Sequence, residues 1–403
     1  MTESRVNQAT EQRLALVNGR IVLPDSIIDD QIVLIEDGKI VAITNLDAIG
    51  DANPIDVGGR WITPGLIDLH THGALGHTFN EPTSEAFAAI CDVNARHGVT
   101  SLCATLAPAP LADMKQCFEF MRVWRSERRS GAHVLGGYLE SPYTNVAQKG
   151  ALDPRCLLSP DDSSADELLE YADVLRIFMV APELSGAIEL VDKINRAGIV
   201  PAAGHSSAHD THVLAAMEHG LRHVTHIWSA MSMVVREGPW RKPGLLEAAL
   251  TFDGLTVEMI ADNKHLPPTL MKLAYKCIGP DRLCAISDAT SGAGLPDGSR
   301  FAMGGMEYEV ADGVGMMFDR SAFAGSTTLL GQMLPILINV VGIPLIEAIR
   351  MTTLTPARVV GVDDRKGSLV AGKDADIVIW NEDFTPWQVL IDGQRHPMNE
   401  FIG

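Results

Sequence analysis

The middle of the chain alternates short apolar runs with longer segments in which apolar residues recur every three or four positions. The short runs have the length of buried strands, and the longer segments have the period of amphipathic helices. The expected helices include 84–97, 111–128, 185–197 and 210–219. The expected strands are 62–70, 100–106, 133–140, 174–181, 199–204, 223–227, 256–262 and 283–288. This order of strands and helices predicts an α/β fold, a (β/α)₈ TIM-type barrel.

Both ends of the chain have a different pattern of apolar and polar residues. Residues 13–60 contain short alternating strands separated by Asn-Gly and Asp-Gly pairs, which are signals for tight hairpins. A similar alternation returns in residues 367–393. We therefore expect a small β-sandwich domain formed from both termini. The expected boundaries are 1–61 plus 358–403 for this domain and 62–357 for the barrel.

Histidines and carboxylates stand at the ends of the expected barrel strands. His70 and His72 finish the first strand, and their i, i+2 spacing points both imidazoles to one face. Later strands end with the same kinds of side chain, namely Glu140, His205, His226 and Asp288. Because the carboxyl ends of barrel strands meet at one mouth, we expect these six side chains to lie together.

Imidazole and carboxylate ligands suit zinc, iron, manganese or cobalt, so the pattern predicts one or two divalent cations per chain. Such a cation lowers the pKa of water from about 15.7 towards about 7. Asp288 beside that water could take its proton and later deliver it to a leaving group. We expect a hydrolase.

Charge and composition narrow the possible partners. The formal net charge of −19 argues against nucleic acid, whose phosphates require a basic surface. Six scattered cysteines without a CxxC pair indicate reduced thiols in a cytoplasmic protein. The most apolar stretch, 328–349, contains Gln332, Asn339 and Glu347, so we expect a buried, interrupted helix and no membrane partner.

Short motifs then follow one another in an order that resembles a known family. They are GLIDLHTHG at 65–73, YLESPY at 138–143, KGA at 149–151, APE at 181–183, GHS at 204–206, THIWSAM at 225–231, REGP at 236–239, ADNKH at 261–265, SDA at 287–289, AGST at 324–327 and TPAR at 355–358. Over nearly its whole length the chain resembles the N-acetylglucosamine-6-phosphate deacetylases of the amidohydrolase superfamily.

The resemblance implies roles for individual residues. Glu140, His205 and His226 would hold the cation that family members share, and His70, His72 and Asp288 would form a second cation position. Asp288 would act as general base and acid. Arg236 and His265 would bind the sugar 6-phosphate, a task that suits a guanidinium fork. The remaining implied substrate-binding residues are Ala151, Ser229, Ala230, Ala324 and Gly325. The resemblance also implies a homodimer.

Four residues depart from the family pattern. Ser141 stands where the family usually has glycine, and Trp228-Ser229 stands where it has Phe-Asn. Leu152 replaces a histidine that helps to polarise the acyl carbonyl. Losing one such donor typically costs roughly 10²–10³ in rate. Either the cations alone polarise the carbonyl, or the substrate differs, or a neighbour takes over. The candidate neighbours are Lys149, His77 and Lys264.

The expected reaction is deacetylation of N-acetylglucosamine 6-phosphate to glucosamine 6-phosphate and acetate. Two substrate alternatives stay open: the galactosamine epimer, and another anionic N-acyl compound. A third alternative belongs to another class, a catalytically silent relative that binds a sugar phosphate. Retention of every expected cation ligand and of Asp288 argues against it, because a binding protein has little use for an activated water.

Overall fold

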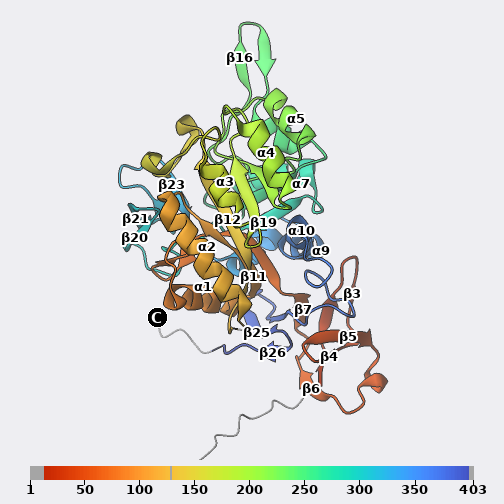
Figure 1. Ribbon diagram of the computed structural model, residues 1–403. Coiled ribbons are helices and arrows are strands. Elements are labelled where there is room, and N and C mark those ends of the chain that lie inside the picture. Colours follow the sequence, from red (N-terminus) through yellow and green to blue (C-terminus); the bar gives the residue numbers. More distant parts are fainter. Residues whose placement is uncertain (1–12, 128, 399–403) are drawn as a thin grey trace, which may run out of the picture.

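The computed structural model describes residues 13–127 and 129–398 of the chain, and its centre is an eight-stranded parallel sheet. The strands are β8 (Leu66–Thr71), β11 (Val99–Leu106), β12 (His133–Tyr143), β13 (Leu175–Val180), β14 (Val200–Ala203), β15 (His223–Val224), β18 (Thr256–Ile260) and β19 (Leu283–Ile286). They follow one another in the sheet in chain order. At the seam, the Asp288 amide donates to the His70 carbonyl at 2.8 Å, and Thr71 forms a parallel bridge with Ala289. The expected TIM-type barrel is confirmed (Figure 1).

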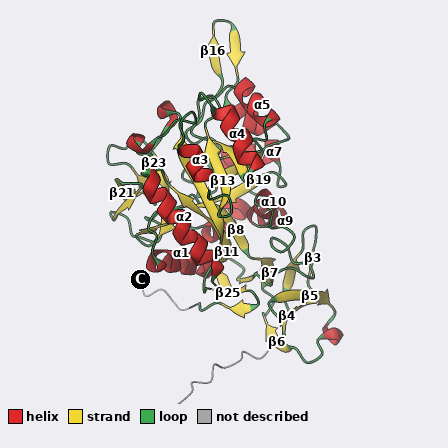
Figure 2. Ribbon diagram, viewed as in Figure 1, coloured by secondary structure: helices red, strands yellow, loops and turns green. Residues whose placement is uncertain are grey.

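Helices surround the sheet (Figure 2). They are α1 (Ser84–Arg96), α2 (Leu111–Ser126), α3 (Ser164–Leu169), α4 (Ala187–Arg196), α5 (Asp210–Glu218), α6 (Leu245–Thr251), α7 (Pro268–Ile278), α8 (Leu330–Pro335), α9 (Leu345–Thr352) and α10 (Leu354–Val359). In α4, Ala187, Leu190, Val191 and Ile194 are buried, which is the i, i+3, i+4, i+7 spacing of one helix face. The amphipathic pattern therefore places this helix against the barrel.

The apolar stretch at 328–349 is interrupted, as expected. Helix α8 ends at Pro335, residues 336–340 form a π-helical turn, and α9 begins only at Leu345. A proline inside a helix removes a backbone donor, which accounts for the change in winding. Within the described residues, no helix combines the length and apolarity needed to cross a membrane.

The prediction of a single strand over 62–70 is wrong. The structure has two strands in this region. β7 (Trp61–Pro64) belongs to a sheet of the terminal segments, and β8 begins the barrel. Gly65 lies between them, and a Cβ added there would stand 2.0 Å from Thr100 Oγ1. Both strands are buried, so the apolar run is continuous and does not reveal the change of sheet.

The two ends of the chain build two sheets that pack face to face. One has the order β5-β4-β1-β6 and the other β26-β25-β24-β7-β2-β3. Their strands are β1 (Leu14–Val17), β2 (Arg20–Val22), β3 (Ile27–Ile28), β4 (Ile32–Glu36), β5 (Lys39–Thr44), β6 (Asn53–Asp56), β24 (Ile377–Trp380), β25 (Pro386–Ile391) and β26 (Gln394–Arg395). Leu16 and Ile35 of the first sheet share one apolar core with Ile62, Ile377 and Leu390 of the second.

The terminal strands therefore form sheets together. The domain boundaries at 1–61, 358–403 and 62–357 stay a prediction, and residues 1–12 and 399–403 lie outside the described residues.

Smaller sheets are inserted into the loops of the barrel. A four-stranded antiparallel sheet after β19 contains β20 (Arg300–Met303), β21 (Met306–Ala311), β22 (Val314–Met316) and β23 (Phe323–Ser326). A two-stranded ribbon of β16 (Val235–Glu237) and β17 (Trp240–Lys242) projects from the body of the protein (Figure 1). A short pair, β9 (Gly73–Ala74) and β10 (His77–Thr78), follows β8.

A buried lysine ties the C-terminal segment to the barrel. The Lys366 ammonium contacts Asp376 and lies 3.1 Å from Asp374 Oδ2. It also lies 3.3 Å from Nδ1 of His133, the first residue of barrel strand β12. The side chain of Lys366 is 1% exposed, so its charge is stabilised by these partners in place of water.

We predict that Lys366→Met destabilises the protein by about 3–5 kcal/mol, because it leaves the buried Asp376 carboxylate without the cation that contacts it. Lys39→Met is the matched control. Lys39 binds the same Asp374 but its side chain is half exposed, so the expected cost is under about 1 kcal/mol. Denaturant unfolding of both variants measures the difference, and equal losses would contradict the prediction.

Candidate active site

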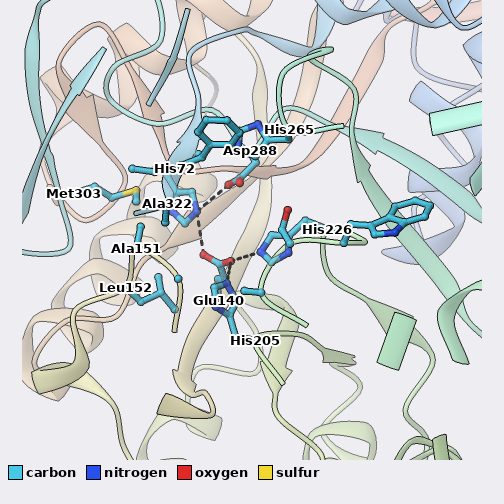
Figure 3. Close-up of a pocket in the computed structure, with 17 residues that line it drawn as sticks. His72, Glu140, Ala151, Leu152, His205, His226, His265, Asp288, Met303 and Ala322 are labelled. Carbon is cyan, nitrogen blue, oxygen red and sulfur yellow. Dashed lines mark hydrogen bonds and ion pairs between the residues drawn. The ribbon is translucent and has the colours of Figure 1, made fainter. Parts of the chain in front are cut away.

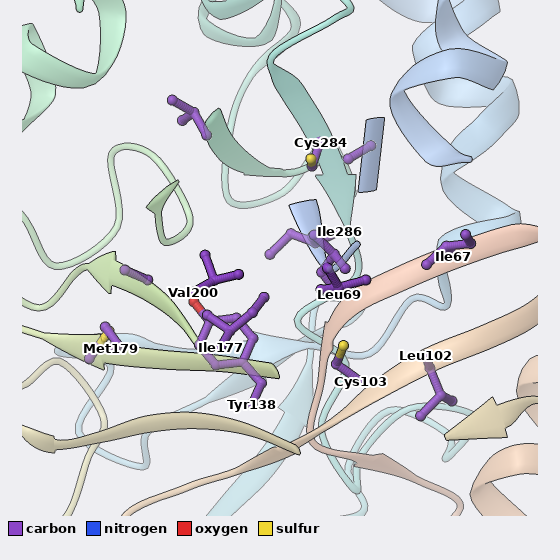
Figure 4. Close-up of a cluster of buried hydrophobic side chains, with 14 of the residues drawn as sticks. Ile67, Leu69, Leu102, Cys103, Tyr138, Ile177, Met179, Val200, Cys284 and Ile286 are labelled. Atoms are coloured by element: carbon purple, nitrogen blue, oxygen red, sulfur yellow. The ribbon is translucent and has the colours of Figure 1, made fainter. Parts of the chain in front are cut away.

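The Glu140 carboxylate, three residues before the end of barrel strand β12, stands at the centre of the expected ligand group. Its Oε1 lies 2.8 Å from His226 Nε2 and 3.1 Å from His205 Nε2. Its Oε2 lies 3.1 Å from His72 Nε2. Figure 3 shows these side chains converging on one point from different strands. The structure therefore brings together residues that lie far apart in the sequence.

His70 and Asp288 complete the group. Asp288 Oδ1 lies 3.4 Å from His72 Nε2 and 3.5 Å from His70 Nε2, and the two imidazole nitrogens are 3.3 Å apart. All six residues are buried. The structure thus places His70, His72, Glu140, His205, His226 and Asp288 at one mouth of the barrel.

Two of these side chains are presented from strained backbone. His205 has φ 45° and Asp288 has φ 48°, both in the left-handed region that non-glycine residues rarely occupy. Each residue stands two positions after the end of a barrel strand, and this conformation turns its side chain into the mouth. Strain of this kind persists only where surrounding structure holds it, and it clusters at functional sites.

Electrostatics show how strongly the six groups interact. Burial opposes ionisation of Glu140, but the imidazoles of His70, His205 and His226 outweigh it and hold the pKa of Glu140 well below its usual range. Burial likewise opposes ionisation of Asp288, yet His70 and His72 lower its pKa. The site is therefore a buried cluster of negative charge that requires a positive partner, either protons on the imidazoles or a cation.

The donor set fits a divalent cation. Two trios, His70-His72-Glu140 and Glu140-His205-His226, each have ligand atoms within 4.8 Å of one another. All the donors are imidazole nitrogens and carboxylate oxygens, the ligands of zinc and related metals. The arrangement is that of a divalent-cation site.

A buried carboxylate behind the ligands, Glu258 in β18, was not expected from the sequence. It accepts a hydrogen bond from His70 Nδ1 at 3.0 Å and lies 2.9 Å from His223 Nε2. Burial disfavours its ionised form, but His70 and His223 lower the pKa of Glu258 to about 2. Because Nδ1 of His70 carries the donated proton, its Nε2 presents a lone pair to the site. The feature of the sequence that could have indicated Glu258 is its position as a charged residue inside the mostly apolar run 256–262.

A second supporting carboxylate is Glu183, the glutamate of the APE motif. It accepts from Ser206 Oγ at 2.6 Å, from the Ser207 amide at 2.5 Å and from Asn145 Nδ2 at 2.9 Å. The backbone amide of Asn145 in turn donates to the His205 carbonyl at 3.0 Å. Glu183 thereby holds the two residues that follow His205 and the side chain of Asn145, whose backbone binds His205.

A pocket of about 280 Å³ opens above the ligand group. Of the residues expected to bind substrate, Ala151, Ser229, Ala230, His265, Ala324 and Gly325 line it. The His265 ring is fixed by Asp262, whose Oδ2 accepts from Nδ1 at 2.7 Å. Sequence reasoning missed the pocket residues Trp228, Met303, Ala322 and Phe323. The last three come from the four-stranded sheet or the turn inside it, and nothing local in the sequence indicates that this sheet reaches the mouth.

Arg236 lies elsewhere. It is exposed on the β16–β17 ribbon, where its Nε donates to the Gly238 carbonyl at 2.8 Å, and it does not line the pocket of its own chain. Leu152 does line the pocket. None of the candidate substitutes for it, Lys149, His77 and Lys264, is among the described residues that line the pocket.

Comparison with known proteins agrees with this geometry. The model of the amidohydrolase family matches residues 61–395. The chain belongs to the amidohydrolase family. Among relatives of this amidohydrolase, the N-acetylgalactosamine-6-phosphate deacetylase of Escherichia coli O157:H7 is 31% identical and aligns over 93% of this chain and 97% of its own. The N-acetylglucosamine-6-phosphate deacetylase of Vibrio furnissii is 30% identical, with 91% and 90% covered. The resemblance to these deacetylases is confirmed.

Solved structures give the same result for the amidohydrolase fold. The N-acetylglucosamine-6-phosphate deacetylase of Pasteurella multocida superposes with a TM-score of 0.89 at 27% identity, covering 95% of this chain and 99% of that one. A point mutant of the Mycobacterium smegmatis deacetylase, in complex with N-acetyl-D-glucosamine-6-phosphate, superposes with a TM-score of 0.88 at 27% identity and the same coverage.

We predict that Glu258→Gln weakens cation binding by roughly 10- to 100-fold, because the neutral amide no longer anchors His70 and His223 as a carboxylate does. Elemental analysis of the amidohydrolase after dialysis against graded chelator measures this. Glu218→Gln, an exposed change at the end of α5, is the control and should keep the parent affinity. Equal metal retention in the two variants would show that Glu258 does not support the ligands.

Proposed function

We propose that this amidohydrolase removes the N-acetyl group of an amino-sugar 6-phosphate, converting N-acetylglucosamine 6-phosphate and water to glucosamine 6-phosphate and acetate. The convergence of six buried ligands beneath a pocket that contains His265 carries the proposal. The names of the relatives and the sugar phosphate bound to the Mycobacterium smegmatis mutant support the substrate class.

The reaction adds water across an amide C–N bond. A divalent cation supplies Lewis acidity, which polarises a carbonyl and lowers the pKa of a water to about 7. Asp288 Oδ1 points into the mouth and is held there by His70 and His72. It takes one proton from the water and delivers a proton to the departing nitrogen, so that the hydroxyl stays on the acyl carbon. The products are a free amine and a carboxylate.

We propose that each chain binds one or two divalent cations. The two ligand trios share Glu140, which supports one cation held with His205 and His226 and a second held with His70 and His72. Asp288 faces the second position. Zinc, iron, manganese and cobalt all accept such ligands.

The galactosamine epimer is the second candidate substrate. The Escherichia coli relative is an N-acetylgalactosamine-6-phosphate deacetylase, and its identity of 31% is similar to the 30% of the Vibrio furnissii N-acetylglucosamine-6-phosphate deacetylase. The convergence of the six expected ligand side chains argues against a catalytically silent role. A cytoplasmic location stays a prediction.

Recognition of the phosphate by Arg236 is compatible with its position if two copies of the chain associate. Arg236 and Arg241 are cross-strand partners, so they share one face of the ribbon. Trp240 is 72% exposed, and the neighbouring Met233, Val234 and Val235 are exposed as well. Exposed apolar residues of this density mark interaction surfaces. We propose a homodimer in which the ribbon of one copy reaches the pocket of the other.

We predict that Asp288→Asn lowers kcat by roughly 10²–10⁴-fold, since the amide cannot take a proton from water. A free-amine assay on both epimers measures the loss. Asp253→Asn is the control, because the Asp253 side chain is 96% exposed and bridges only Arg282 in the described structure. Wild-type protein that holds metal yet hydrolyses neither epimer would overturn the deacetylase proposal.

We predict that Arg236→Ala lowers kcat/KM for the phosphorylated substrate by roughly 10- to 100-fold, the value of a charge-assisted contact. It should leave the much slower reaction of the unphosphorylated sugar unchanged. Lys276→Ala, an exposed change on α7 outside the ribbon, is the control and should behave like the wild type. A loss of the same size with both sugars would exclude a phosphate contact, and light scattering of each variant would show whether the dimer persists.

A further inference from the structure

One wall of the pocket is apolar. Figure 3 shows Ala151, Leu152, Met303 and Ala322 together on the side of the pocket next to His72 and Glu140. His265 lies at another side, nearer to Asp288, and His226 lies across the ligand group from the apolar wall. The pocket therefore has different chemistry at its different sides.

The apolar wall is rigid because the four-stranded sheet supports it. Met303 belongs to an apolar cluster with Phe301 and Tyr308, and Ala151 packs against that cluster. The Tyr308 hydroxyl donates to the Ala151 carbonyl at 2.6 Å. A close-packed support of this kind does not rearrange easily to offer a new hydrogen bond.

Several backbone groups of the wall already have partners. The Leu152 amide donates to the Lys149 carbonyl at 3.0 Å, and the Ala322 carbonyl accepts from the Met317 amide at 3.1 Å. Met303 pairs with Met306 in the β20–β21 ladder. Together with the bond between Tyr308 and Ala151, these contacts satisfy the Leu152 amide and the carbonyls of Ala151 and Ala322, so those groups are not offered to a ligand.

Only one part of the proposed substrate matches an apolar wall. A phosphorylated sugar is polar over its ring and its phosphate, and the alkyl end of its N-acyl group is its apolar part. The wall lies beside the ligand group, where the amide must stand to react. Apolar surface is best buried against apolar surface, so the acyl alkyl group matches this wall.

We infer that Ala151, Leu152, Met303 and Ala322 form an acyl-binding wall that selects alkyl acyl groups and rejects hydroxylated ones. The inference rests on the proposed deacylation and specifies its acyl group. The enzyme accepts N-propionyl as well as N-acetyl amino-sugar 6-phosphates. It discriminates against the N-glycolyl compound, which has nearly the same size as N-propionyl but carries a hydroxyl.

The test compares three substrates with the same sugar 6-phosphate: N-acetyl, N-propionyl and N-glycolyl. In each, water adds its hydroxyl to the acyl carbon and its proton to the nitrogen, so the free-amine assay applies to all. We expect kcat/KM for N-propionyl to exceed that for N-glycolyl by at least about 10-fold, because the hydroxyl finds no partner at the wall.

Two variants at position 152 locate the discrimination. Leu152→Asn keeps the branching of the side chain at Cγ and offers an amide to the hydroxyl, so the propionyl-to-glycolyl ratio should fall to within about threefold. Leu152→Met keeps the wall apolar and should keep the wild-type ratio. Thermal unfolding shows whether each variant is folded, and the wild-type ratio tests the inference even if Leu152→Asn does not fold.

The outcomes separate the two proposals. Turnover of the N-acetyl compound with N-glycolyl hydrolysed as well as N-propionyl would overturn the acyl wall and leave the deacetylase proposal standing. A wild-type preference that Leu152→Asn leaves unchanged would overturn the assignment to this wall. Failure to hydrolyse any of the three would overturn the proposed function and the acyl wall together.

Discussion

The pairing that closes the barrel between β8 and the segment after β19 is the contact on which the site depends. The Asp288 amide binds the His70 carbonyl, and buried Asp68 reinforces the seam by accepting hydrogen bonds from both Ser287 and the His70 amide. Without this seam the first and last ligands in the chain would lie at opposite edges of an open sheet. Closure brings them within 3.5 Å.

Concentrating carboxylates and imidazoles in a buried mouth has an energetic consequence. Charges there are poorly solvated, so each must be held by a specific partner. Glu258 fixes the ring of His70 from behind, and Glu183 fixes the residues that follow His205 and the Asn145 side chain beside it. Glu258 lies on barrel strand β18, and Glu183 lies in the loop that follows β13. The ligand geometry is thereby prepared before any substrate enters.

The barrel supplies the reactive centre, and inserted elements supply much of the wall around it. The four-stranded sheet after β19 contributes Met303, Phe323 and Ala324 to the pocket, and the ribbon carries Arg236 away from it. Many amidohydrolases share such a barrel, so substrate choice must come from insertions of this kind. In this chain Leu152 and the inserted sheet make one side of the pocket apolar, which gives the acyl end of a substrate a different environment from its phosphate end.

The sequence by itself determined the barrel, the terminal sheets and the six residues at the strand ends, because run length and the position of a polar residue at the end of an apolar run are local features. It could not show that the run 62–70 crosses from one sheet to another at Gly65, since both strands are equally apolar. It also missed Glu258, whose partners His70 and His223 are separate in sequence, and it did not place Arg236 outside the pocket. Those facts depend on which distant segments meet, and only the closed barrel and its insertions decide that.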